Sequence, residues 1–205
     1  MPLRLLAEGA DELAVFYSNS NIAPEAEYER RWDELQRYCD AQGIPVQRDA
    51  YDPDEWEAKV APVGESLKAY SPAFGAASDA SSVQELLDDG RRSERCRLCY
   101  RMRLQKAAAF AAREGFDGLA SSLAVSPYQF AAEMDEELAR ACEPLGLTPV
   151  IRDFRPYYRE ATQISRDLGM YRQNYCGCRF SVAEAEATRA FIKAQRKARK
   201  AARAM

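Results

Sequence analysis

The sequence predicts an α/β fold in which helices flank a parallel sheet. Short apolar runs of strand length alternate with segments of helical periodicity along most of the chain. Of the 205 residues, 47% are hydrophobic, which is enough to bury one core and too many for a disordered protein. We therefore expect a single α/β domain over residues 1–205.

The individual elements can be placed from periodicity and from glycines that end helices, such as Gly9, Gly43 and Gly169. In chain order we expect a helix at 3–9, a strand at 12–17, a helix at 25–42, a strand at 44–50, a helix at 54–60, a helix at 94–114, a strand at 116–124, a helix at 129–143, a strand at 147–152, a helix at 158–169 and a basic C-terminal helix within 181–205. The first helix has no strand before it, although a strand feeds each helix of a doubly wound unit.

One segment changes character. Residues 62–93 are rich in Ser, Ala, Gly and Asp, and we expect a mobile surface insert there, with a short helix around Val83–Leu87.

Composition excludes several classes of chemistry. The chain has no histidine, which excludes Ser-His and Cys-His catalysis and zinc sites with His ligands. The net charge of −3 gives no global basic field for nucleic acid. No apolar run approaches the roughly 18 residues of a membrane span, and the N-terminus lacks the apolar stretch of a signal peptide. We therefore expect a cytoplasmic protein with reduced thiols and no membrane partner.

Two cysteine pairs are the main candidates for chemistry. Cys96 and Cys99 form a CxxC motif near the start of a predicted helix, where both sulfurs share one face and the helix N-terminus would favour thiolates. Cys176 and Cys178 flank Gly177, which permits a tight turn that directs both sulfurs the same way. Only folding can bring these two pairs together.

Three interpretations of the four thiols stay open from spacing alone. The four thiols hold a structural zinc, or they serve an iron–sulfur cluster or thiol redox chemistry, or their spacing is a coincidence. The remaining cysteines, Cys39 and Cys142, lie among apolar residues of predicted helices, and we expect them to be buried and inert.

Arginines and aromatic residues surround both pairs, as a ligand with phosphates and bases requires. Each arginine alone is equally consistent with a solvated helix face. The first pair is flanked by Arg95, Arg97, Arg101 and Arg103, and the second by Tyr171, Arg172, Gln173, Asn174, Tyr175 and Arg179.

Two other polar features are candidates for binding. Asn19 and Asn21 follow a predicted strand, where α/β folds bind ligands, although ordinary turn chemistry explains them equally well. The C-terminal helix carries a basic stripe that either contacts an RNA backbone or is a solvated tail. Its cations are Lys193, Arg196, Lys197, Arg199, Lys200 and Arg203.

Several strings in fixed order resemble the QueH-type epoxyqueuosine reductases. They are FYSNSNI with EYERR, IPVQRDAYDPDEW, RCRLCYRMRL, SLAVSP, RDFR and LGMYRQNYCGC, and they extend to about residue 181. The resemblance implies a Rossmann-like sheet of the PP-loop (HUP-like) type, with a C-terminal helical portion that carries the CGC pair. It also implies reduction of the epoxide of epoxyqueuosine at the wobble position of tRNA, the last step of queuosine biosynthesis.

The resemblance further implies a [4Fe–4S] cluster, an additional iron and an unidentified electron donor. Cys96 and Cys99 match the cluster-binding CxxC, and Cys176 and Cys178 match a pair that is either a redox-active dithiol or a set of further metal ligands. On this interpretation Tyr171 or Tyr175 donates a proton. The expected tRNA contacts are Arg101, Arg103, Arg172, Gln173, Asn174, Asn19 and Asn21.

The family's first strand and its CCAPCS-like Cys-Cys motif have no counterpart here, because this sequence starts at MPLRLLAEG, just beyond their expected place. We therefore expect the true N-terminus to lie upstream of Met1, which accounts for the helix without a preceding strand. Two alternatives to the reductase are a PP-loop-like tRNA-modifying ATPase or sulfur transferase, and a non-enzymatic RNA-binding module with a structural four-cysteine zinc site.

Overall fold

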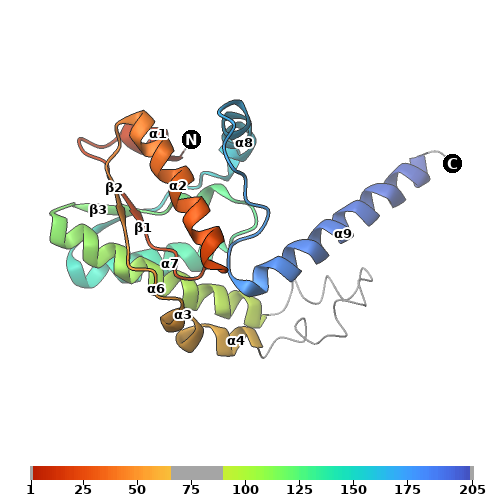
Figure 1. Cartoon of the computed structure of the whole chain (residues 1–205), viewed down its shortest axis with the longest axis horizontal. Coiled ribbons are helices and arrows are strands. Elements are labelled where there is room, and N and C mark those ends of the chain that lie inside the picture. The colour runs from red at the N-terminus through yellow and green to blue at the C-terminus, as the bar shows by residue number, and fades with distance from the viewer. Residues whose placement is uncertain (1, 66–89, 204–205) are drawn as a thin grey trace.

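The computed structural model describes residues 2–65 and 90–203 (Figure 1). It is a mixed α/β structure, mostly helical, with two short parallel strand pairs. In one, β1 (Val15–Tyr17) pairs with β2 (Val46–Arg48), and in the other, β3 (Gly118–Ala120) pairs with β4 (Thr148–Val150). The α/β class and all four strand positions are confirmed. Within the described residues, the single predicted sheet is replaced by two separate pairs.

The strands are shorter than predicted for local reasons. After β3, the Ser121 hydroxyl accepts the Leu123 N–H at 3.3 Å and starts the 3-10 helix η2 (Ser122–Val125). In β4, Pro149 lacks the N–H that a longer ladder would need.

The helices follow the predicted order closely. They are α1 (Pro2–Ala7), α2 (Glu25–Gln42), α3 (Pro53–Lys59), α7 (Ala131–Cys142), α8 (Tyr158–Asp167) and α9 (Arg179–Arg203), with 3-10 turns η3 (Glu143–Leu145) and η4 (Arg155–Tyr157). The predicted stop at Gly43 is confirmed, because this residue has a φ of 65° and its N–H bonds to the Asp40 carbonyl. The Asp52 side chain caps α3 by accepting the Glu55 N–H at 2.9 Å.

The predicted insert is wrong at both of its ends. Helix α4 (Ala61–Glu65) occupies its start, and α6 (Gly90–Glu114) begins inside its last residues. Gly64 lets α4 lie close to its neighbours, since a Cβ there would come within 2.6 Å of Phe180 and 2.9 Å of Arg95. The rest of the predicted insert, including the expected helix around Val83–Leu87, lies outside the described residues.

Helix α6 runs through the centre of the fold and contributes to two hydrophobic clusters. One packs α6 against α7 and includes Tyr100, Leu104, Met134 and Leu138. The other joins Trp56 of α3, Cys99 of α6, and Cys178 and Phe180 around the start of α9. The second cluster therefore brings together segments from both cysteine motifs.

Beyond its first turns, helix α9 extends away from the other described helices and strands (Figure 1). Among the described helices, none is long and apolar enough to cross a membrane.

Candidate active site

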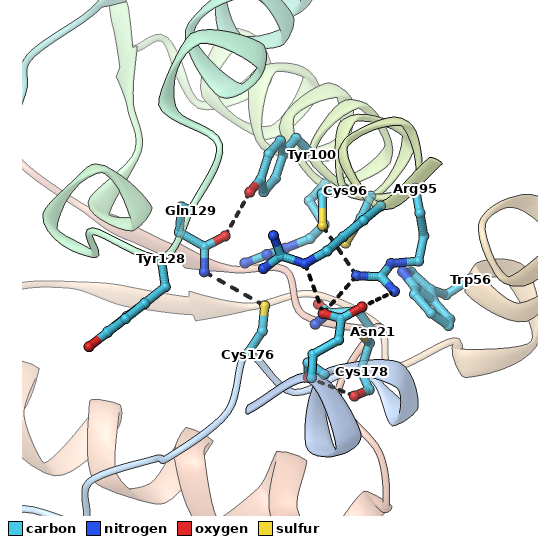
Figure 2. A pocket seen from close by; sticks show the side chains of 14 residues that line it. Asn21, Trp56, Arg95, Cys96, Tyr100, Tyr128, Gln129, Cys176 and Cys178 are labelled. Atoms are coloured by element: carbon cyan, nitrogen blue, oxygen red, sulfur yellow. Dashed lines mark hydrogen bonds and ion pairs between the residues drawn. The ribbon is translucent and has the colours of Figure 1, made fainter. Parts of the chain in front are cut away.

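One small cavity is lined by all four cysteines of the two motifs (Figure 2). Cys96 and Cys99 come from α6, and Cys176 and Cys178 come from the loop that leads into α9. The cavity has a volume of about 40 Å³, which is room for a few water molecules. Folding thus places the two pairs at one site, as the site hypothesis requires.

The α6 wall of the cavity is one helical face. Its lining residues follow i, i+3, i+4 spacing and are Arg92, Arg95, Cys96, Cys99, Tyr100 and Arg103. Cys96 lies in the second turn of α6 and Cys99 in the third, so the predicted place at a helix N-terminus is wrong. Burial raises the pKa of the Cys96 thiol to about 12 and also raises the pKa of Cys99, so in the metal-free structure burial opposes the expected stabilisation of thiolates.

The opposite wall is the irregular Cys176–Cys178 loop. Residues of α2, which lies far from this loop in the sequence, hold it in place. Arg31, almost fully buried, donates to the Cys176 carbonyl at 2.7 Å and the Tyr175 carbonyl at 3.3 Å, and its Nε binds Glu27 at 2.8 Å. Gly177 has a φ of 136°, and a Cβ there would lie 2.7 Å from Ile22 Cγ1. The expected need for glycine is confirmed, in both conformation and space.

The loop is closed by its own helix. The Ser181 hydroxyl accepts the Gly177 N–H at 3.0 Å and donates to the Cys178 carbonyl at 2.7 Å. Burial raises the pKa of Cys178, and neighbouring Cys176 raises it further. Three of the four thiols are therefore biased towards the protonated form.

A buried ion pair joins the two walls. Arg95, only 2% exposed, binds Glu184 of α9 at 2.6 and 3.1 Å, and Arg92 binds the same carboxylate at 3.3 Å. Arg95 Nη2 also lies 3.5 Å from Cys96 Sγ (Figure 2). The guanidinium thus lies between a carboxylate and a thiol, and it offsets negative charge on either.

A short hydrogen-bond chain reaches the second cysteine pair from α6. The Tyr100 hydroxyl donates to Gln129 Oε1 at 2.7 Å, which fixes the amide so that Gln129 Nε2 faces Cys176 Sγ at 3.8 Å (Figure 2). The same hydroxyl accepts the Phe130 N–H at 3.3 Å. Burial raises the pKa of Tyr100, so this phenol stays protonated and can donate.

Two buried polar atoms beside the cavity have no hydrogen-bond partner among the described residues. They are Oδ1 of Asn21 and Nε1 of Trp56, an acceptor and a donor. Buried groups of this kind are rare in folded proteins, and a polar ligand in the cavity would satisfy them.

The other predicted contacts lie in three places. Arg103 lines the cavity and binds the Ser18 carbonyl at 2.7 Å and the Asn19 side chain. Arg101 instead points to α7, where it binds Glu137 at 2.8 and 2.9 Å. Arg172, Gln173 and Asn174 are exposed on the segment before the loop.

The two predicted proton donors face α2 rather than the cavity. Tyr171 donates to Glu27 at 2.9 Å, and Arg30 lies over its ring. Tyr175 donates to the Ala23 carbonyl at 3.4 Å, and Arg31 lies over its ring. Both therefore act in the structure as supports for the cysteine loop. Cys39 and Cys142 are fully buried, as predicted.

Sequence reasoning missed half of the cavity lining. The missed residues are Trp56, Arg92, Tyr100, Tyr128, Gln129, Ser181 and Glu184. Arg92 and Tyr100 could have been found, because they share a helical face with Cys96 and Cys99. Nothing local identifies Trp56, Tyr128 or Gln129, whose positions depend on tertiary packing.

Four thiols have the donor chemistry of a soft-metal site. However, in residues 2–65 and 90–203 no group of three or more Cys, Asp or Glu side chains is placed to hold a metal ion. A cavity of about 40 Å³ also lacks the room for a four-iron cluster. In this arrangement the described residues do not fit the expected cluster.

The sequence matches one family almost from end to end. The model of the family described as epoxyqueuosine reductase QueH matches residues 1–71 and 65–184. An epoxyqueuosine reductase QueH of Thermotoga maritima is 29% identical over 184 residues, which cover 88% of this chain and 85% of that protein. One of Dehalococcoides mccartyi is 26% identical over 172 residues, covering 84% and 80%. Because the family model accounts for residues 1 to 184 without a gap, this chain belongs to the epoxyqueuosine reductase QueH family.

Proposed function

We propose that this chain reduces the epoxide of epoxyqueuosine in tRNA to the alkene of queuosine. The observation that carries the proposal is the convergence of all four motif thiols on one buried cavity in a member of this family. The cavity is too small for a nucleoside, so only the epoxide-bearing edge of the substrate would reach the thiols.

The reduction balances with the Cys176 and Cys178 thiols as the reductant. The epoxide takes up two electrons and two protons, both C–O bonds break, a C=C bond forms and the oxygen leaves as water. The dithiol supplies those two electrons and two protons and closes to a disulfide. A disulfide across one intervening residue closes a small strained ring, so an external dithiol donor would reduce it readily.

The groups around the thiols would orient the substrate. Asn21 Oδ1 offers an acceptor and Trp56 Nε1 a donor to its polar groups, and Arg103, which binds Asn19, lines the same cavity. Tyr100 is better placed than Tyr171 and Tyr175 to donate a proton at the epoxide oxygen, because only Tyr100 lines the cavity, and Gln129 beside it can donate a hydrogen bond.

The tRNA contacts would lie outside the cavity. Arg172, Gln173 and Asn174 are exposed next to the cysteine loop and are the predicted contacts that are free to meet the anticodon. Arg101 has a buried carboxylate partner in Glu137, so its expected phosphate contact would have to compete with that pair.

The [4Fe–4S] cluster and the additional iron stay predictions from the family resemblance. Cys96 and Cys99 are their first candidate ligands. Binding of a cluster would need further ligands or a wider cavity than the described residues provide.

We infer that the two strand pairs are halves of one Rossmann-like arrangement. Both pairs are parallel, a helix crosses over within each, and α6 contacts both, through the stacked rings of Phe16 and Phe110 and through β3.

Anaerobic incubation of the reduced chain with epoxyqueuosine-containing tRNA tests the function, with nucleoside mass spectrometry as the readout. We expect queuosine, formed at about one per chain when no external reductant is added, together with a Cys176–Cys178 disulfide in the recovered peptide. Absence of queuosine would contradict the proposed function. Queuosine formed without that disulfide would contradict only the role of the dithiol.

The same assay separates the two alternatives. An ATPase or sulfur transferase would need ATP for turnover, and a zinc module would bind RNA without turnover. Neither has an observation in its favour beyond those that support the reductase.

A further inference from the structure

The last part of α9 has a charge distribution unlike the rest of the chain. Residues 187–205 contain seven Lys or Arg and no Asp or Glu. The preceding 186 residues contain 22 Lys or Arg against 32 Asp or Glu, a net charge of −10. This basic segment lies beyond residue 184, where the family match ends.

Most of these cations share one face of the helix. Arg189, Lys193, Arg196, Lys197 and Lys200 follow i, i+4, i+7, i+8, i+11 spacing and are exposed. We call these five residues the basic stripe. It spans about 16 Å along the helix axis, from the 1.5 Å rise per residue.

The side of the helix opposite the stripe packs on the fold near its base and carries mostly small side chains further along. Glu184, which binds Arg92 and Arg95, lies on the side opposite the stripe. Further along, that side carries mainly alanines, with Phe191 as its one large apolar residue before Ala194 and Ala198. So little apolar area gives weak anchoring in a lipid surface.

The helix is fixed to the active site at its base. Cys178 directly precedes α9, the ion pair of Glu184 holds its first turns, and Arg189 donates to the Asn174 carbonyl at 2.9 Å. The stripe therefore starts beside the cysteine loop, and α9 extends from there away from the other described elements (Figure 1). Lys193 and Lys200 lie about 22 Å and 33 Å along the axis from Cys178.

We propose that the basic stripe binds the phosphate backbone of the substrate tRNA beyond the reacting nucleoside. This inference rests on the proposed function, because a nucleoside held at the thiols places the adjoining RNA stem within reach of the stripe. The positive charges of the stripe complement the negative charges of the phosphates. They also offset the repulsion between those phosphates and the acidic surface of the rest of the protein.

The test compares two charge-matched variants of the full chain. In the stripe variant, Lys193, Arg196, Lys197 and Lys200 are all changed to Gln. In the control, the exposed residues Arg4, Arg37, Arg113 and Arg140 are changed to Gln. Binding of an unmodified tRNA transcript is measured at several salt concentrations, and reduction of epoxyqueuosine-containing tRNA is measured as kcat and KM.

For the stripe variant we expect at least tenfold weaker binding at 0.1 M salt, and a slope of log K against log salt that is smaller by about 3. The KM of the stripe variant should rise by a similar factor, while its kcat at saturation is retained. The control variant should bind and react like the unmodified chain. Equal binding by the two variants would overturn the role of the stripe and leave the proposed function intact. Failure of the unmodified chain both to bind tRNA and to reduce the epoxide would overturn the proposed function as well. The inference would also be overturned if the unmodified chain bound anionic lipid vesicles through the stripe but did not bind tRNA through it.

Discussion

The two cysteine pairs reach the same cavity by different routes. Cys96 and Cys99 are held by the regular backbone of α6, whose i, i+3 spacing places both sulfurs on one face. Cys176 and Cys178 lie in an irregular loop whose position depends on residues about 145 positions earlier in the chain. The helical pair is therefore a local feature, while the loop pair is a product of tertiary structure and is the easier of the two to displace.

The largest effect should come from removing the main support of the loop. Arg31→Met removes two hydrogen bonds to the Tyr175 and Cys176 carbonyls and leaves Glu27 without its buried partner. We expect the free energy of unfolding to fall by about 3 kcal/mol and turnover to fall about 100-fold, since ångström-scale misplacement of a reacting group has that cost. Denaturant unfolding and the queuosine assay measure the two effects.

Arg37→Met on the same helix is the matched control, because Arg37 is exposed and pairs only with Glu34 in the described residues. It should change stability by less than about 0.5 kcal/mol and leave turnover unchanged. Similar losses in both variants would mean that α2 as a whole, rather than the contacts of Arg31, supports the loop.

A smaller effect is expected at the turn itself. Gly177→Ala places a Cβ 2.7 Å from Ile22 Cγ1 at a φ of 136°. We expect a cost of roughly 2 kcal/mol in the free energy of unfolding and a loss of turnover of about tenfold. Gly115→Ala, also at positive φ but with nothing within 4 Å of the new Cβ, separates the backbone strain from the steric clash. If both variants lose turnover equally, the clash with Ile22 has no part in positioning the cysteines.

The same contrast between local structure and tertiary packing explains how much of the fold can be predicted from the sequence alone. Periodicity and glycine stops predict every described α-helix and strand except α4, because those signals are local, but they miss the three described 3-10 helices. They could not show that Ser121 and Pro149 shorten the strands, or that α4 and the first turn of α6 replace the ends of the predicted insert. These outcomes depend on capping and on contacts with Phe180 and Glu184.

For the site, motif spacing identifies the four thiols but does not show the burial that opposes their ionisation in the metal-free structure. The prediction took Cys96 to be at a helix N-terminus, whereas burial dominates its pKa. Nearness in sequence to the CGC pair favours Tyr171 and Tyr175 as proton donors, although neither lines the cavity. Tyr100 and Gln129 approach Cys176 only through the packing of α6 against the segment before α7.

Burial of the helical pair predicts a pH dependence of stability in the metal-free protein. The folded-state pKa of Cys96 is about 12, above the ordinary value near 9. A raised pKa means that its contribution to stability is fully present below pH 9 and is lost as the pH rises towards 12. The free energy of unfolding should therefore fall above pH 9, by about 1.4 kcal/mol per pH unit for each such thiol.

Denaturant unfolding between pH 8 and pH 11 checks this dependence. Above pH 9, Cys96→Ala should make the slope of the free energy of unfolding against pH shallower by the contribution of one thiol. Substitution of the exposed Arg37 by Met should not change this slope. An identical slope in the Cys96→Ala variant would show that this thiol is not buried in the folded protein.

The smallest effect is expected from the cysteines outside the cavity. Cys39→Ala and Cys142→Ala remove buried thiols that lie on other helices and do not line the site. Each should lower stability by about 1 kcal/mol through lost packing and leave the rate of queuosine formation unchanged. A loss of turnover at constant stability would give one of these thiols a role that the structure does not suggest.

The central claim is that the four thiols lining one cavity all belong to the reactive site, with Cys176 and Cys178 as the reductant, and paired substitutions test it most directly. Queuosine formation from epoxyqueuosine-containing tRNA is measured for Cys96→Ser with Cys99→Ser, for Cys176→Ser with Cys178→Ser, and for Cys39→Ser with Cys142→Ser. The account predicts that turnover is lost in the first two variants and retained by folded protein in the third. Retained turnover without either the helical pair or the loop pair would contradict it.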